Sequence, residues 1–206
     1  MVKVIGYKLV SRIFMSALFV VMVNINSSCQ SNKSPKIDSY NKITESFSLN
    51  KSGKTIIVDK GERKMILFKD GKKLSAFKVT IGEEPGNKRR SGDNRTPEGI
   101  FVVGKIENSK NWYYYPDNDT SEPVLGAYGD WFIRLIVPGF QGIGIHGHYH
   151  DNDLGNRASK GCIRLSNNKL QEVVDFAEVG TPVLIIPGKK DVEANTEELK
   201  AVINHR

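Results

Sequence analysis

The sequence predicts a mostly β domain with one α-helix packed on it, and three observations lead to this fold class. From Thr55 onward, short runs of β-branched and aromatic residues alternate with glycine-containing turns, a pattern typical of strands. One segment, from Leu170 to Ala177, repeats apolar residues at helical spacing. The stretch between Thr55 and Ile186 is long enough to bury one hydrophobic core. We therefore expect one β-rich domain over residues 53–187.

The expected strands follow one another along the chain. Turn residues at Lys60–Glu62 and Asp70–Lys72 separate the first three runs by only a few positions, which favours an antiparallel meander. The aromatic segment Trp112–Pro116 leads into a turn between two later runs. The runs that we expect to form strands are Thr55–Asp59, Lys64–Phe68, Ala76–Ile81, Ile100–Val103, Trp131–Val137 and Val183–Ile186.

The expected helix follows from the positions of its apolar residues. Leu170, Val173, Val174 and Ala177 lie at i, i+3, i+4 and i+7, so they share one helix face. Ser166 or Asn167 can cap its start, and Gly180 is expected to stop it. Residues 188–206 are expected to form a charged tail with at most one short helix, over Glu197–Ile203.

The first 28 residues have the features of an export signal. Lys3, Lys8 and Arg12 form a basic region, and a mainly apolar run of eleven residues, Ile13–Val23, follows. Eleven helical residues at ~1.5 Å each span ~16 Å, about half of a ~30 Å hydrocarbon core. This length fits the hydrophobic region of a signal peptide better than a membrane span, so we expect residues 1–28 to be a signal peptide.

Cys29 follows a short run of small residues, and this junction resembles a lipoprotein processing site. The resemblance implies that Cys29 becomes the lipidated first residue of an exported protein on the periplasmic or cell-surface side of the envelope. An ordinary secretory signal or an uncleaved anchor are the alternatives. Residues 29–52 are rich in Ser, Asn and Lys and are expected to be a tether.

The charge distribution excludes one class of partner. Residues 1–28 carry three basic and no acidic residues, so their removal would lower the formal charge from +7 to +4. The remaining Lys and Arg are interspersed with Asp and Glu, unlike the basic stripe of a nucleic-acid-binding protein. A modest basic excess favours approach to an anionic cell envelope.

Cys162 is the candidate nucleophile of the sequence. It lies sixteen residues after His146, and an imidazole base can activate a thiol and hold it as a thiolate. Gly161 beside it removes a side chain from the turn, so that backbone N–H groups can approach a developing oxyanion. A lone cysteine is otherwise most often a small buried hydrophobic residue.

The residues around Cys162 and His146 resemble the catalytic signature of the bacterial L,D-transpeptidases (YkuD-like). The matching segments are Ile145–Gly147, Ser159–Arg164, Thr96–Phe101 and Gly180–Val183. The resemblance extends from about Thr55 to Pro187 and implies the β-sandwich-like fold of that family. One position departs from the pattern, because Lys160 stands where the family usually has a second histidine before the Gly-Cys pair.

The resemblance also implies a set of roles and partners. Cys162 would attack a peptidoglycan stem peptide, and an amine on another stem or on an envelope protein would accept the acyl group, with no cofactor. His146 would be the base, oriented by the carbonyl of Gly147, and the amides of Cys162 and Gly161 would hold the oxyanion. The remaining candidates, all near the substrate, are Ser159 to hold the turn, Arg164 to bind a carboxylate or form a structural ion pair, His148 to shape the pocket, and Lys160.

Two alternatives share these residues. If water accepts the acyl group, the protein would be an L,D-carboxypeptidase, or a hydrolase that releases proteins linked to peptidoglycan. The segment Gly92–Gly99 resembles the branch of the family in which such activity occurs. A non-catalytic cell-wall-binding module is the third reading, and Lys160 is the only residue that favours it.

A metal site competes for the same histidines. Three imidazoles and two carboxylates lie within eight residues, at His146, His148, His150, Asp151 and Asp153. The residues after Asp151 signal a loop, which would prevent the three histidines from sharing one strand face. A metal site would also leave Cys162 without a role, so we expect a catalytic His146 and no metal.

Overall fold

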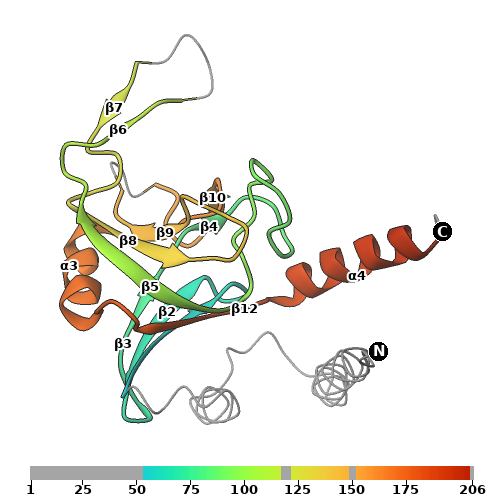
Figure 1. Ribbon diagram of the computed structural model, residues 1–206, viewed down its shortest axis with the longest axis horizontal. Coiled ribbons are helices and arrows are strands. Elements are labelled where there is room, and N and C mark those ends of the chain that lie inside the picture. Colours follow the sequence, from blue (N-terminus) through green and yellow to red (C-terminus); the bar gives the residue numbers. More distant parts are fainter. Residues whose placement is uncertain (1–52, 117–121, 149–151, 205–206) are drawn as a thin grey trace, which may run out of the picture. The chain divides into compact units, whose positions relative to one another are not determined.

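The computed structural model describes residues 53–116, 122–148 and 152–204, all of which belong to one compact unit. Its main feature is a curled eight-stranded sheet with the strand order β11-β9-β8-β5-β12-β1-β2-β3 (Figure 1). The expectation of a mostly β domain with a packed helix is therefore confirmed. The strands of this sheet are β1 (Lys54–Asp59), β2 (Lys64–Lys69), β3 (Lys72–Lys78), β5 (Gly99–Asn108), β8 (Trp131–Ile136), β9 (Gly144–His146), β11 (Ile163–Arg164) and β12 (Pro182–Ile186).

One half of the sheet is the expected meander. β1 pairs with β2 and β2 with β3, both antiparallel. The expected strand Ala76–Ile81 is wrong at both ends, because β3 already begins at Lys72 and ends at Lys78. Thr80 instead forms an isolated bridge with Arg164, and its N–H donates to the Arg164 carbonyl at 2.7 Å. This bridge ties the end of the meander to the strand that follows Cys162.

The other half of the sheet places His146 at the end of β9 and Cys162 directly before the neighbouring strand β11. β12 lies between β1, to which it is parallel, and β5, to which it is antiparallel. β5, β8 and β9 then continue antiparallel, and β11 pairs parallel with β9, with Arg164 opposite His146. β9 and β11 are only three and two residues long, which is why residue runs did not predict them.

Two small ladders complete the fold. β4 (Ile81–Gly82) pairs parallel with β10 (Arg157–Ser159), and this pair lies directly before the Cys162 turn. β6 (Tyr113–Tyr114) pairs antiparallel with β7 (Val124–Leu125). Like β9 and β11, these four strands were not predicted as separate strands, because two or three residues carry too little pattern.

The helix α3 (Asn167–Phe176) confirms the predicted apolar face, of which Leu170 and Val173 are fully buried in the main core. Ser166 is its N-cap residue, although its side chain makes no capping hydrogen bond. Gly180 does not stop the helix, because Ala177 is already extended and Gly180 forms the later turn into β12. A second core cluster contains Ile57, Ile66, Phe68 and Leu184.

A sixteen-residue helix, α4 (Lys189–Asn204), replaces the expected tail (Figure 1). Its larger apolar residues are exposed rather than buried, so they did not indicate a packed helix, and its charged composition resembled a solvated segment. In the part of the chain that the structure describes, no helix is both long enough and apolar enough to cross a membrane. The predicted signal peptide, the predicted tether and the predicted lipidation site at Cys29 lie outside the described residues.

Candidate active site

Cys162 lies in the turn between β10 and β11 and is partly buried. Its thiol donates to the Gly142 carbonyl, with 3.2 Å between Sγ and the oxygen. Burial raises the pKa of this thiol, and the backbone N–H of Gly144 and the nearby Arg164 only partly oppose that effect. In the resting protein, Cys162 is therefore a protonated thiol at neutral pH.

His146 ends β9 and is buried. Its Nδ1 lies 2.8 Å from the Gly147 carbonyl oxygen, which can only accept a hydrogen bond. The proton therefore lies on Nδ1, and Nε2 is the free base. Burial lowers the pKa of His146 to about 3, with smaller contributions in the same direction from Arg164 and His148, whereas the bond to Gly147 raises it.

The two pKa shifts correct one expectation from the sequence. An imidazole that held the thiol as a thiolate would have a raised pKa, and the thiol a lowered one, but both shifts have the opposite sign. The resting pair is a neutral imidazole and a neutral thiol. Ile145 and Ile163 pair with one another and are fully buried, so His146 and Cys162, each one residue away, lie on the other face of the strands.

Ser159 and Thr96 hold the Cys162 turn. The Ser159 hydroxyl donates to the Cys162 carbonyl at 2.6 Å and accepts from the Gly161 N–H at 3.1 Å. The Thr96 hydroxyl, fully buried, donates to the Gly161 carbonyl at 3.0 Å. Gly161 has φ = +126°, and a Cβ there would lie 2.8 Å from the Arg95 carbonyl oxygen, so only glycine fits.

The hydrogen bonds of the Cys162 turn leave fewer free oxyanion donors than the sequence predicted. The Gly161 amide was expected to hold the oxyanion with that of Cys162, but it is already bonded to Ser159. It is therefore not free to serve as an oxyanion donor in this conformation. Thr96 was not assigned a role from the sequence, although it belongs to the segment that carries the family resemblance.

An aromatic wall surrounds His146. The ring of Phe132 stacks on the imidazole with 5.3 Å between centroids and 11° between planes, and Tyr128 meets it edge-on at 5.0 Å. A groove of about 400 Å³ opens along this wall and reaches Gly142, the acceptor of the Cys162 thiol. It is lined by Trp112, Tyr113, Tyr115, Tyr128, Phe132, Arg134 and Gly142. Of these residues, the sequence singled out only the tyrosine-rich segment.

Asp153 engages two of the predicted substrate-binding residues. Arg164 donates from Nη2 to the Asp153 carboxylate at 2.9 Å and to the Ala158 carbonyl at 2.6 Å. Of the two readings of Arg164, the structure contains the ion pair. His148 Nε2 lies 2.8 Å from the same carboxylate, and the His148 side chain is fully buried. His148 therefore lies beneath the site rather than along its groove.

Asn167, the first residue of α3, fixes the backbone beside His146. Its side chain accepts from the His148 N–H at 2.9 Å and donates to the His148 carbonyl at 2.7 Å. A Cβ on Gly147 would lie 1.9 Å from the Asn167 Oδ1, so this contact requires glycine at 147. The sequence indicated Asn167 only as a helix cap.

Lys160 is exposed, and its ammonium lies 5.4 Å from the centre of the Tyr114 ring. It therefore lies against the aromatic segment next to the groove. Within the described ranges, no group of three or more His, Cys, Asp or Glu residues could hold a metal ion. His150 and Asp151 of the alternative metal motif lie outside those ranges.

Comparisons with known proteins identify the family. The sequence model of the L,D-transpeptidase catalytic domain (YkuD) matches residues 53–185. YqjB of Bacillus subtilis (strain 168), which carries the provisional name of an L,D-transpeptidase, is 33% identical over 113 residues. That similarity covers 54% of this chain and 63% of YqjB, so the chain spans less than two thirds of this relative.

Two solved structures share the fold. An L,D-transpeptidase from Mycobacterium smegmatis has a TM-score of 0.50 and 18% identity over 65% of this chain and 58% of its own. The structure described as the Ldtfm-avibactam carbamoyl enzyme has a TM-score of 0.50 and 25% identity over 66% of this chain and 49% of its own. Because the family match covers well over half of its sequence, the chain belongs to the L,D-transpeptidase catalytic domain (YkuD) family.

Proposed function

We propose that this protein is a peptidoglycan L,D-transpeptidase that forms a thioester on Cys162. The observation that carries the proposal is the site itself: the Cys162 thiol lies directly before β11, and the His146 imidazole ends the neighbouring strand β9, with Nδ1 bonded to the Gly147 carbonyl and Nε2 left as the base. Family membership supports the substrate class. The relative described as a carbamoyl enzyme with avibactam supports covalent chemistry at such a site.

The proposed first half-reaction begins from the neutral pair. Sγ of Cys162 attacks the carbonyl of the third stem-peptide residue while Nε2 of His146 takes the thiol proton. The Cys162 amide donates to the oxyanion. When the tetrahedral intermediate collapses, the carbon–nitrogen bond to the fourth residue breaks, and His146 returns the proton to the departing D-amino acid. Concerted proton transfer fits the depressed pKa of His146, since a stable imidazolium would be costly there.

In the second half-reaction, an amine replaces the thiol. The amine of another stem peptide, or of an envelope protein, attacks the thioester and gives a proton to Nε2 of His146, and Cys162 leaves as a thiol. The groove along Trp112 and Tyr128 is the proposed path of the stem peptide. Arg134, which lines that groove, and Lys160 beside it supply positive charge for a substrate carboxylate.

Hydrolysis is the alternative outcome of the same acyl-enzyme. The resemblance of Gly92–Gly99 to the hydrolytic branch of the family favours it, and the structure gives this segment a defined conformation. Asp93 accepts bonds from the N–H groups of Arg89 and Arg90 and from the Lys88 ammonium. Water would then attack the thioester in place of the amine.

Product analysis separates these functions. Purified muropeptides are incubated with the full chain, and the products are identified by mass spectrometry, with Cys162→Ala as the matched control. Cross-linked dimers would establish transfer, and tripeptides alone would establish hydrolysis. Unchanged muropeptides, with a folded protein, would contradict both and support a binding module.

We further propose that the protein works outside the cytoplasmic membrane. The basic region, the short apolar run and the small residues before Cys29 support export and lipidation. A lipid on Cys29 and a tether over residues 29–52 would hold the catalytic domain near its peptidoglycan substrate.

A further inference from the structure

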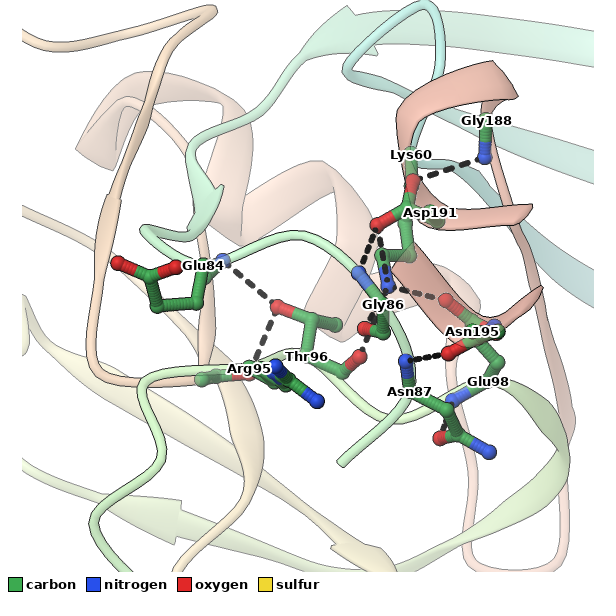
Figure 2. Close-up of polar contacts among 12 residues, drawn as sticks. Lys60, Glu84, Gly86, Asn87, Arg95, Thr96, Glu98, Gly188, Asp191 and Asn195 are labelled. Atoms are coloured by element: carbon green, nitrogen blue, oxygen red, sulfur yellow. Dashed lines mark hydrogen bonds and ion pairs between the residues drawn. The ribbon is translucent and has the colours of Figure 1, made fainter. Parts of the chain in front are cut away.

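The helix α4 lies beyond the part of the chain that defines the family. The family match ends at residue 185, and α4 begins at Lys189. The helix contacts the segment 86–98 through Asp191, Asn195 and Glu198, which at i, i+4 and i+7 share one face. Figure 2 shows the contacts of Asp191 and Asn195. Its larger apolar residues are not used for this contact, because they are 42 to 62% exposed; they are Val192, Leu199, Val202 and Ile203.

Asp191 is the centre of this contact and is fully buried. Its carboxylate accepts from the N–H groups of Gly86 and Gly188, each at 2.9 Å (Figure 2). It also pairs with the ammonium of Lys60 at 2.9 Å and the guanidinium of Arg157 at 2.6 Å. Burial raises the pKa of Asp191, but the interactions with Lys60, Gly86 and Arg157 outweigh it, so the pKa is lowered and the group is an anion.

The first arm of this contact runs through Arg157 to the Cys162 turn. Arg157 begins β10, and Ser159 ends it. The Ser159 hydroxyl holds the turn from inside, by its bonds to the Gly161 N–H and the Cys162 carbonyl. The ion pair between Asp191 and Arg157 therefore holds one end of a three-residue strand, and the other end of that strand holds the nucleophile turn.

The second arm runs through Lys60, whose side chain is fully buried. Its ammonium donates to the Thr96 carbonyl at 3.1 Å and pairs with Glu98 at 2.6 Å. The Thr96 hydroxyl then donates to the Gly161 carbonyl at 3.0 Å. Both arms start at one carboxylate and end within residues 159–162.

We propose that Asp191 is a positioning residue for Cys162. Through Asp191, the helix α4, which lies outside the family domain, sets the geometry of the nucleophile turn. This rests on the proposed function in that Cys162 is the nucleophile. A helix needed only for stability would bury its apolar face. α4 instead places the buried Asp191 carboxylate between Lys60 and Arg157, the two cations whose contacts continue to the Cys162 turn.

The test compares acyl transfer with thiol exposure in Asp191→Asn. The full chain carries Cys29→Ser, so that Cys162 is its single thiol. A misplaced nucleophile should lower kcat on muropeptides by about tenfold or more and change KM by less than about threefold. A loosened turn should admit solvent to the thiol, so iodoacetamide should alkylate Cys162 about threefold faster or more at neutral pH.

Three further variants separate positioning from loss of stability. Arg157→Gln should reproduce the Asp191→Asn effects, and Arg157→Lys, which keeps a cation for Asp191, should recover part of kcat. Ile66→Val and Ile66→Ala loosen the second core cluster, away from the turn. When their melting temperature matches that of Asp191→Asn, the Ile66 variants should keep the kcat and the alkylation rate of the wild-type protein.

Several outcomes would overturn the proposal. A folded Asp191→Asn protein with the kcat and the alkylation rate of wild type would do so. Ile66 variants with the same melting temperature as Asp191→Asn and the same changes in kcat and alkylation rate would also do so. If the wild-type protein transfers no acyl group, the proposed function fails, but the alkylation rates still decide whether Asp191 positions Cys162.

Discussion

At the scale of residues, burial controls the protonation of the proposed catalytic pair. It raises the pKa of Cys162 and lowers that of His146 to about 3, so neither group is charged at neutral pH. Substrate binding in the groove must bring the carbonyl to a thiol whose base is already unprotonated. The pair is thus prepared for proton transfer during attack rather than for storing a thiolate.

The neutral pair predicts the pH dependence of Cys162 alkylation. Only the thiolate reacts with iodoacetamide, so the rate should rise steadily with pH, with its midpoint above the ordinary thiol pKa of about 8.5. The rate is measured from pH ~5 to ~10 in Cys29→Ser protein. A reactive plateau already present below pH ~6 would instead show a thiolate–imidazolium pair.

Lys160 is predicted to act on substrate binding more than on the thiol. Its ammonium lies over Tyr114, whereas the cations that act on the thiol are Arg164, Lys88 and Arg134. We therefore expect Lys160→Met to shift the alkylation midpoint by less than ~0.5 pH unit. It should raise KM for stem peptides a few-fold, because the positive charge proposed for a substrate carboxylate is lost, and an exposed ion pair is worth about 0.2–1 kcal/mol. A large shift of the midpoint in Lys160→Met, with Lys160→Arg unchanged, would contradict this.

The sequence indicated the identity of the site but not its electrostatics. Cys162 and His146 could be found because their residue types and spacing are distinctive. The pKa shift of His146 depends on burial, and its ring contacts with Phe132 and Tyr128 come from other segments, so no local pattern encodes them. The sequence indicated that Ser159 holds the turn, but not that its hydroxyl binds the Gly161 amide, because residue types alone do not fix the backbone conformation of the turn.

At the scale of elements, α3 supports the site by its first residue. The two hydrogen bonds of Asn167 hold the backbone of His148 and so fix the Gly147 carbonyl that orients His146. The helix packs into the main core through Leu170 and Val173. The core thereby sets the position of the side chain that fixes the base.

Asn167→Ala is therefore expected to affect both stability and catalysis. The His148 amide and carbonyl would lose their partners, which should lower the free energy of unfolding by about 1–3 kcal/mol. Poorer orientation of His146 should reduce kcat by about tenfold. Denaturant unfolding and steady-state kinetics measure the two effects, with Asn168→Ala, one residue along the same helix, as control. Equal kcat in Asn167→Ala and wild type would show that α3 does not orient the base.

The elements that the sequence predicted are those with enough residues to show a period. The longer strands of the main sheet and α3 were found, because four or more of their residues share a pattern. β4, β9, β10 and β11 are two or three residues long and form only because longer strands position them. α4 was missed as a full helix because its charged composition resembled a solvated segment, and its apolar residues are exposed rather than buried.

At the scale of the whole molecule, the described domain extends the family domain by a helix. α4 joins the end of β12 to segments near residues 60, 86–98 and 157, far apart in sequence. The proposed consequence is a nucleophile turn held from two sides. N-terminal to this domain, the proposed lipid anchor would limit where the protein can act.

The anchor gives a prediction for the full protein. Native protein expressed in a bacterial host should partition into detergent and carry a lipid on Cys29, and Cys29→Ser should become soluble or retain its signal. Several acyl chains bind a membrane stably, whereas one chain gives only marginal binding with K of about 10⁴ M⁻¹. Phase partition and N-terminal mass analysis check this, with Cys162→Ser as the control for loss of a thiol. An unlipidated N-terminus at another residue would refute the anchor.

The central claim is that Cys162 forms the acyl-enzyme with His146 as its base. Intact-mass spectrometry after incubation with a carbapenem tests it most directly, because opening of the strained ring leaves a stable adduct on the attacking thiol. We predict a single adduct that maps to Cys162, no adduct in Cys162→Ala, and adduct formation slowed by about 10²–10⁴ in His146→Ala. Unmodified wild-type protein, under conditions in which iodoacetamide labels Cys162, would contradict the account.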